Sequence, residues 1–183
     1  MSKWQAIIFD LDDTLYPERD YVQSGFRAVA AWAEMHLGIG TDDGFKQLEG
    51  LFDRGFRRDT FDRWLAMHRI WSKSHVARLV EVYRGHAPDI NPFPEVNVVL
   101  ESLKTAYRLG LVSDGYLAMQ QRKLTALNLA HYFDAIVFSD ELGREAWKPD
   151  PRPFELVLKR LGLVDGAPGV FVGDNPSKDF LGA

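Results

Sequence analysis

Nine residues near the start of the chain, Ala6-Ile7-Ile8-Phe9-Asp10-Leu11-Asp12-Asp13-Thr14, decide the fold: a short apolar run ends abruptly in a cluster of acids. Three further apolar runs end in polar residues in the same way, at 109–112, 135–138 and 170–172. Runs that are hydrophobic on both faces, separated by helical patterns, are typical of βαβ units, in which helices cover both sides of a parallel sheet. The sequence therefore predicts an α/β fold with a doubly wound parallel sheet.

Helical periodicity occupies most of the remaining chain. Between the predicted strands, apolar residues recur at helical spacing over 95–106, 117–129 and 153–161, and Gly110 and Gly162 stand where helices should stop. The stretch 16–92 has no convincing strand and carries four amphipathic helical segments, at 21–37, 44–52, 60–68 and 74–83. We therefore expect an α/β core formed by 1–15 and 93–183, with 16–92 inserted as a helical domain.

The composition restricts the possible chemistry and partners. The chain has 183 residues, of which 46% are hydrophobic and 26% charged, which is enough for one compact core and a modest insertion. The absence of cysteine excludes disulfides, thiolate metal ligands and a cysteine nucleophile. A net charge of -4 without a basic cluster speaks against nucleic acid, and no apolar run reaches the roughly 18 residues of a membrane span. We expect a cytoplasmic protein with neither nucleic acid nor a membrane as partner.

The C-terminal edge of the predicted sheet is short of elements. The chain stops at Ala183, nine residues after Asp174, where an α/β domain usually continues with a helix and an edge strand. An open edge exposes unpaired backbone groups. We expect this edge of the core to be incomplete.

Polar side chains gather where the predicted strands end. Because the carboxyl ends of parallel strands lie along one edge of the sheet, where ligands bind in a crevice, side chains from separate segments should converge there. Those that we expect to form a site are Asp10, Asp12, Ser113, Asp114 and Asp174. Ser139, Asp140 and Glu141 lie on the same edge, and we expect them to cap loops instead.

The spacing of the first acids favours a metal ion. Asp10 and Asp12 are two residues apart, so in an extended chain their side chains point to the same side, whereas Asp13 faces the other way. Two close carboxylates repel each other and favour a cation that neutralises both. Carboxylates without cysteine favour a hard ion such as Mg²⁺, with Asp174 as a further ligand. Such an ion also lets an anionic Asp approach an anionic phosphate.

Donors for a phosphate lie on two other segments. Ser113 offers a hydroxyl, and in the following Asp114-Gly115 the glycine lets backbone amides turn toward an anion. Lys148, in a loop stiffened by Pro149 and Pro151, can place an ammonium beside the phosphoryl oxygens. Asp179 is suited to hold Lys148 or a metal-bound water in position.

Four motifs in order resemble those of the haloacid dehalogenase-like hydrolases: "DLDDT" at 10–14, "SDG" at 113–115, "KPDP" at 148–151 and "GDNPSKD" at 173–179. The resemblance spans the chain except 16–92, which is similar in size and placement to the helical cap of that superfamily. It implies a Rossmann-like core below the cap. It also implies a phosphatase, because the true dehalogenases of the family lack an acid at the position of Asp12.

The resemblance further implies a two-step phosphoryl transfer on a small phosphorylated metabolite. Asp10 attacks phosphorus to give an aspartyl-phosphate, and Asp12 protonates the leaving alcohol and then deprotonates the attacking water. Mg²⁺ is held by the Asp10 carboxylate, the Asp12 backbone carbonyl and Asp174. Ser113 and Lys148 bind the phosphoryl oxygens, Thr14 supports the loop and Asp179 stands behind them. Two alternatives stay open: a phosphomutase of the same superfamily, and a non-catalytic module with this fold.

Overall fold

The computed structural model of the chain describes residues 4–163 and 168–183. Within them the chain divides into two compact units. The core unit consists of Met1–Glu18 and Ile90–Ala183, and the helical unit consists of Arg19–Asp89. The helical unit lies within the segment 16–92.

A four-stranded parallel sheet forms the centre of the core unit. Its strands are β1 (Ala6–Phe9), β2 (Arg108–Ser113), β3 (Ala135–Phe138) and β4 (Gly169–Val172), in the order β3-β2-β1-β4. Every neighbouring pair is parallel, and Ile8 of β1 lies opposite Gly110 and Phe171. The four apolar runs of the sequence are therefore the four strands, and the predicted α/β fold with a parallel sheet is confirmed.

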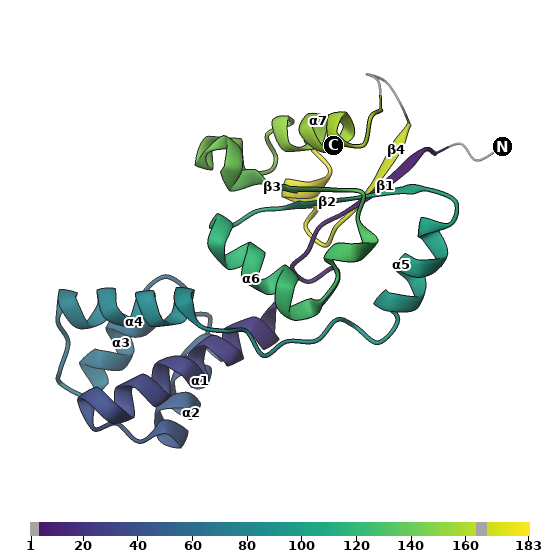
Figure 1. The fold of residues 1–183 in the computed structure, drawn as a ribbon. Helices are drawn as coiled ribbons and strands as arrows, with labels where there is room; N and C mark the ends of the chain where they lie inside the picture. The colour runs from purple at the N-terminus through teal and green to yellow at the C-terminus, as the bar shows by residue number, and fades with distance from the viewer. Residues whose placement is uncertain (1–3, 164–167) are drawn as a thin grey trace. The chain divides into compact units, whose positions relative to one another are not determined.

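Helices cover both faces of this sheet (Figure 1). Helix α7 (Arg152–Arg160) lies on one face, and α5 (Val96–Lys104) and α6 (Leu117–Leu127) lie on the other. Short helices complete the core unit: η1 (Ala130–Tyr132), η2 (Ser139–Leu142), η3 (Arg144–Ala146) and α8 (Pro176–Asp179). The apolar side chains between α7 and the sheet include Ala6, Ile8, Val112, Val137, Val157 and Leu161.

The two glycines expected to stop helices have different roles. Gly162 follows α7 with φ +69°, a left-handed conformation that ends many helices. Gly110 does not end a helix, and that expectation is wrong: it lies within β2. A Cβ at Gly110 would stand 2.9 Å from Val157, so the missing side chain lets α7 approach the sheet closely.

The helical unit has its own core. Its helices are α1, which begins in the core unit (Glu18–Leu37), α2 (Thr41–Asp53), α3 (Thr60–Met67) and α4 (Lys73–Gly85). Their apolar faces meet around fully buried side chains, among them Val29, Leu48, Trp64, Leu65 and Leu79. Because each helix alone is amphipathic, this shared core is what stabilises the unit.

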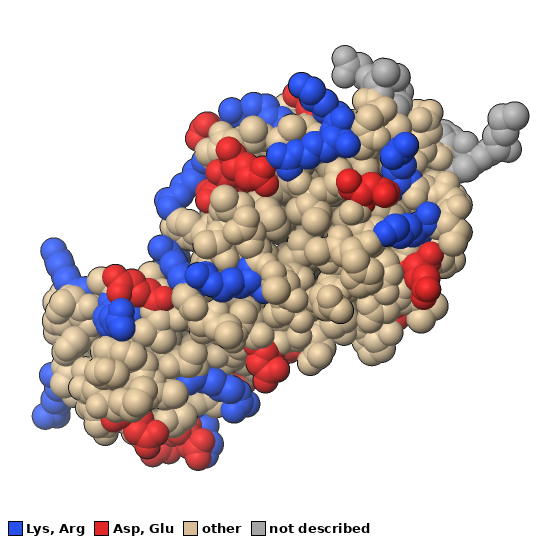
Figure 2. Space-filling view, viewed as in Figure 1, with Lys and Arg blue, Asp and Glu red and all other residues tan. Residues whose placement is uncertain are grey.

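The surface carries both signs of charge. On the face seen in Figure 2, basic and acidic side chains are interspersed over both units. The basic side chains do not form a continuous area on this face. Among the described residues, no helix is both long and apolar enough to cross a membrane.

Candidate active site

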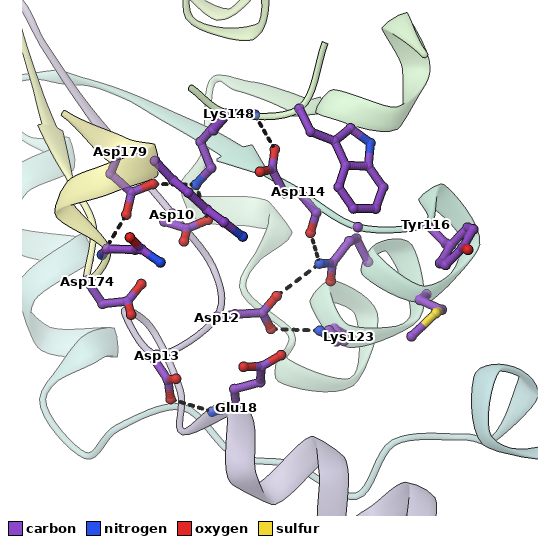
Figure 3. Close-up of a pocket in the computed structure, with 16 residues that line it drawn as sticks. Asp10, Asp12, Asp13, Glu18, Asp114, Tyr116, Lys123, Lys148, Asp174 and Asp179 are labelled. Carbon is purple, nitrogen blue, oxygen red and sulfur yellow. Dashed lines mark hydrogen bonds and ion pairs between the residues drawn. The ribbon is translucent and has the colours of Figure 1, made fainter. Parts of the chain in front are cut away.

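A cavity of about 300 Å³ opens in the core unit, beside the carboxyl ends of β1, β2 and β4 (Figure 3). All of its lining residues belong to the core unit, and charged side chains predominate among them. They are Asp10, Asp12, Asp13, Glu18, Asp114, Gly115, Tyr116, Met119, Gln120, Lys123, Trp147, Lys148, Asp174, Asn175, Lys178 and Asp179. The structure therefore brings together the acids and Lys148 from segments that are far apart in the sequence.

Lys148 lies between two carboxylates. Its Nζ is 2.8 Å from Asp10 Oδ1 and 2.7 Å from Asp179 Oδ1, and the side chain of Lys148 is only 2% exposed (Figure 3). Burial alone would lower the pKa of Lys148, but the two carboxylates outweigh it and raise the pKa above its ordinary value. The backbone N–H of Lys148 donates to Asp114 Oδ1 at 3.1 Å. This ammonium is therefore held charged and in a defined place.

Asp10 follows the last residue of β1 and is almost buried. Burial raises the pKa of Asp10 from 3.8 to about 6, although the neighbouring Lys148 opposes the shift. The ionised carboxylate is therefore poorly solvated, and it gains from any further positive charge in the cavity.

Three carboxylates can share one cation. Oxygens of Asp10, Asp174 and Asp179 lie within 4.8 Å of one another. Asp179 is also tied to the loop after β4, since its Oδ2 accepts the N–H of Asn175 at 2.9 Å. Burial raises the pKa of Asp174, and the charges of Asp13 and Asp179 add to this. An oxygen-only set with this excess of negative charge fits a hard divalent ion such as Mg²⁺.

Asp12 has different partners from Asp10. Its Oδ1 accepts a hydrogen bond from Lys123 Nζ at 2.7 Å and another from the hydroxyl of Tyr16. Its Oδ2 accepts from Gln120 Nε2 at 2.9 Å. The Asp12 carboxylate is thus bound by donors, while the metal-compatible oxygens belong to Asp10, Asp174 and Asp179.

The position of Asp13 differs from the expectation. Strand alternation predicts that Asp13 faces away from Asp10 and Asp12, but Asp13 lines the same cavity. Its φ of +50° is left-handed, so the extended chain has already ended at this residue and the alternation no longer applies. Asp13 Oδ1 accepts the N–H of Glu18 at 2.8 Å, which ties the loop to the start of α1.

Ser113, the predicted phosphate ligand, and Thr14, predicted to support the loop, both lie outside the cavity lining. Ser113 is fully buried at the end of β2, and its hydroxyl has no hydrogen-bond partner among the described residues. The buried hydroxyl of Thr14 likewise has none there. Asp114 and Gly115 do line the cavity, and Gly115 has φ +130°, a conformation that other residues rarely adopt.

Of the three residues after β3 that we expect to cap loops, Asp140 and Glu141 bind backbone N–H groups, whereas the Ser139 hydroxyl has no hydrogen-bond partner among the described residues. Asp140 accepts the N–H of Leu117 at 3.0 Å, and Glu141 accepts the N–H of Phe138 at 3.1 Å. Asp140 also accepts from the indole of Trp147 at 3.3 Å.

The sequence interpretation missed two buried residues of α6, Gln120 and Lys123. The buried residues of this helix are Gln120, Lys123, Leu124 and Leu127, which share one face. Polar side chains at positions of an apolar stripe are unusual, because each loses its hydration when it is buried. That pattern is visible in the sequence and could have identified both.

The sequence and the structure of this chain are both similar to those of known proteins. The family described as haloacid dehalogenase-like hydrolase matches residues 7–183, almost the whole chain. The chain belongs to this hydrolase family. The family resemblance and the expectation of an enzyme are thereby confirmed.

Relatives within the haloacid dehalogenase-like hydrolases carry phosphatase names. A glyceraldehyde 3-phosphate phosphatase of Methanothermobacter thermautotrophicus is 32% identical, and the match covers 98% of this chain and 80% of the relative. One of Methanopyrus kandleri is 33% identical over 98% of this chain and 79% of the relative. The crystal structure of a phosphatase of the family from Thermococcus onnurineus is similar with a TM-score of 0.60, at 28% identity, over 97% of this chain and 80% of that one.

Proposed function

We propose that this hydrolase is a Mg²⁺-dependent phosphatase that cleaves a small organic phosphate monoester through an aspartyl-phosphate on Asp10. The observation that carries the proposal is the cavity in which Asp10 stands beside Lys148, with its Oδ1 2.8 Å from Lys148 Nζ. A nucleophilic carboxylate and a fixed ammonium in one small cavity suit an anionic phosphoryl group.

Asp10 is the proposed nucleophile. One of its oxygens forms a bond to phosphorus as the bond from phosphorus to the leaving oxygen breaks, and the electron pair of that bond goes to the leaving oxygen. Lys148, which also contacts Asp179, neutralises charge on the phosphoryl oxygens. Ser113 remains a proposed phosphate ligand, supported by its buried hydroxyl, which has no partner within the described residues.

Asp12 is the proposed acid and base. Its protonated carboxyl gives a proton to the leaving oxygen, which departs as an alcohol. In the second step Asp12 accepts a proton from water as the water oxygen attacks phosphorus. The bond between phosphorus and Asp10 then breaks, which releases inorganic phosphate and restores the free carboxylate.

Asp10 and Asp174 are the proposed side-chain ligands of Mg²⁺, with the Asp12 backbone carbonyl as a further ligand. The support is the set of carboxylate oxygens of Asp10, Asp174 and Asp179 within 4.8 Å of one another. When bound, the ion supplies positive charge that lets an anionic nucleophile approach an anionic phosphate. Because Asp179 contacts both Lys148 and Asn175, we propose that it positions the site.

The helical unit is the proposed cap. It is inserted between the first motif, at 10–14, and the second, at 113–115, and it has a hydrophobic core of its own. We propose glyceraldehyde 3-phosphate as the first substrate to test, on the strength of the relatives' names.

Phosphate release tests the proposal. The purified chain should release phosphate from 4-nitrophenyl phosphate and from glyceraldehyde 3-phosphate in the presence of Mg²⁺, and Asp10→Asn should lose this activity while it keeps the circular dichroism spectrum of the wild type. Asp42→Asn, which changes an exposed acid in the first turn of α2, is the matched control and should retain activity. Isomerisation of a hexose phosphate without phosphate release would instead indicate a mutase. Binding without turnover across the panel would indicate a non-catalytic module.

A further inference from the structure

Helix α6 presents two buried polar side chains to the acid after β1. Gln120 and Lys123 are three residues apart on one face of α6 and are 2% and 3% exposed. Lys123 Nζ is 2.7 Å from Asp12 Oδ1 (Figure 3). Gln120 Nε2 is 2.9 Å from Asp12 Oδ2. The helix therefore contacts both oxygens of one carboxylate.

The orientation of the Gln120 amide is determined by its neighbours. Its Nε2 donates to Asp12 Oδ2 and also to the backbone oxygen of Asp114. Both neighbours are acceptors, so the NH₂ group and not the oxygen of the amide must lie there. Gln120 thereby links Asp12, in the loop after β1, to Asp114, in the loop after β2.

The two oxygens of Asp12 differ in how many further hydrogen bonds they can accept. A carboxylate oxygen has about two acceptor positions. Those of Oδ1 are used by Lys123 and by the hydroxyl of Tyr16. Oδ2 accepts from Gln120, which leaves one position of Oδ2 available within the described part of the site. Oδ2 is therefore the oxygen of Asp12 with an acceptor position left for a further donor.

A purely structural role explains these residues poorly. An apolar residue of similar size would fill the same place beside Leu124 without losing the hydration of a charge. Buried ion pairs contribute little net stability compared with apolar substitutes. The arrangement is understandable if it serves the carboxylate that it contacts.

We propose that Gln120 and Lys123 are positioning residues for the general acid and base Asp12, which they hold with Oδ2 as the oxygen that exchanges the proton. This inference rests on the proposed function, since it assigns the residues that orient a group of that reaction. Neither side chain contacts the phosphoryl group in this account. They act through Asp12.

The dependence on the leaving group tests this role. An alkyl phosphate needs a proton on its leaving oxygen, whereas 4-nitrophenolate leaves well without one. Lys123→Met and Gln120→Leu should each lower kcat/KM for glyceraldehyde 3-phosphate by at least about tenfold more than they lower kcat/KM for 4-nitrophenyl phosphate. This difference is a part of the roughly 10²–10⁴-fold effect of acid-base catalysis. In an Asp12→Asn background, either substitution should change kcat/KM by less than about twofold, because the group they position is already gone.

Matched controls separate this effect from damage to the fold. Gln121→Leu changes the exposed neighbour of Gln120 on the same helix, and Lys159→Met changes an exposed lysine of α7. Both should leave the ratio of the two kcat/KM values unchanged. If Lys123→Met fails to fold by circular dichroism, the uncharged Gln120→Leu variant alone carries the test.

Each outcome has a distinct meaning. Equal losses on both substrates, or a full further loss in the Asp12→Asn background, would overturn the positioning role. A wild-type enzyme that hydrolyses neither ester would instead refute the proposed function. If the Gln120 and Lys123 variants keep the wild-type ratio of the two kcat/KM values, while Asp12→Asn selectively loses activity on glyceraldehyde 3-phosphate, this inference alone is refuted.

Discussion

Asp10→Asn should make the metal-free protein more stable at neutral pH, although it removes the proposed nucleophile. Asp10 is 8% exposed, and burial raises its pKa to about 6 from 3.8. Asparagine resembles the neutral carboxyl and cannot ionise. The substitution therefore removes the free-energy cost of keeping a charge at this place.

The size and sign of the effect follow from linkage. The folded-state pKa of Asp10 is raised, so the folded protein favours the protonated carboxyl. The contribution of this group to the free energy of unfolding is therefore fully present below pH 3.8 and is lost as the pH rises through about 6. A shift of about two pKa units corresponds to about 3 kcal/mol. For a chain of this size, that difference corresponds to a Tm shift of about 6–12 °C.

Thermal unfolding of both proteins in a chelator, followed by circular dichroism between about pH 4 and pH 7.5, measures this prediction. The Tm of Asp10→Asn minus that of the wild type should be small at the acidic end and should grow as the pH rises. Saturating Mg²⁺ should restore most of the wild-type deficit, since a ligand at 100 times its Kd stabilises by about 2.7 kcal/mol. Asp42→Asn, in the exposed first turn of α2, should change stability by less than about 1 kcal/mol.

A less stable Asp10→Asn variant at neutral pH would refute the reasoning. It would mean that the ion pair with Lys148 stabilises the fold by more than the burial of Asp10 destabilises it. A difference that does not change with pH would equally contradict it, since the ionisation of Asp10 would then not be its cause.

Four further predictions follow from the same structure. Lys148→Met should abolish phosphate release and lower the metal-free stability by about 3–5 kcal/mol in a denaturant titration, because Asp10 and Asp179 then lose the charge between them. Chelation of divalent ions should abolish phosphate release, and added Mg²⁺ should restore it; activity that survives chelation would contradict the proposed metal. Gly50→Ala should raise stability by about 0.5–1 kcal/mol in the same titration, because Gly50 lies inside α2 and a Cβ there has open space. Trp64→Ala should destabilise the helical unit by about 3–5 kcal/mol, measured by hydrogen exchange, since this side chain is fully buried in its core.

Much of the fold could be predicted from the sequence because its strands are buried on both faces. The apolar runs coincide with β1 to β4 to within a residue or two at each end, and the periodic segments coincide with the longer helices. Buried faces produce apolar residues at regular intervals in the sequence, so strands and longer helices can be recognised from that spacing. The short helices η1, η2 and η3 span three or four residues each, too few for a period to be recognised.

The candidate site was less accessible to such patterns. The acids were found because they follow strand ends, but the direction of Asp13 was not, because its φ of +50° depends on the turn and not on the strand. The position of Lys123 in the apolar stripe of α6 can be recognised in the sequence, but its contact with Asp12 cannot, because the two residues are 111 positions apart. Such a contact is visible only when the fold brings α6 beside the loop after β1.

The covalent intermediate tests the central claim most directly. The wild-type protein, mixed with glyceraldehyde 3-phosphate labelled in its phosphate and quenched in acid, should carry the label on the peptide that contains Asp10. Asp10→Asn should carry none. Turnover of the labelled ester without any labelled protein, or a label on a peptide without Asp10, would contradict the account.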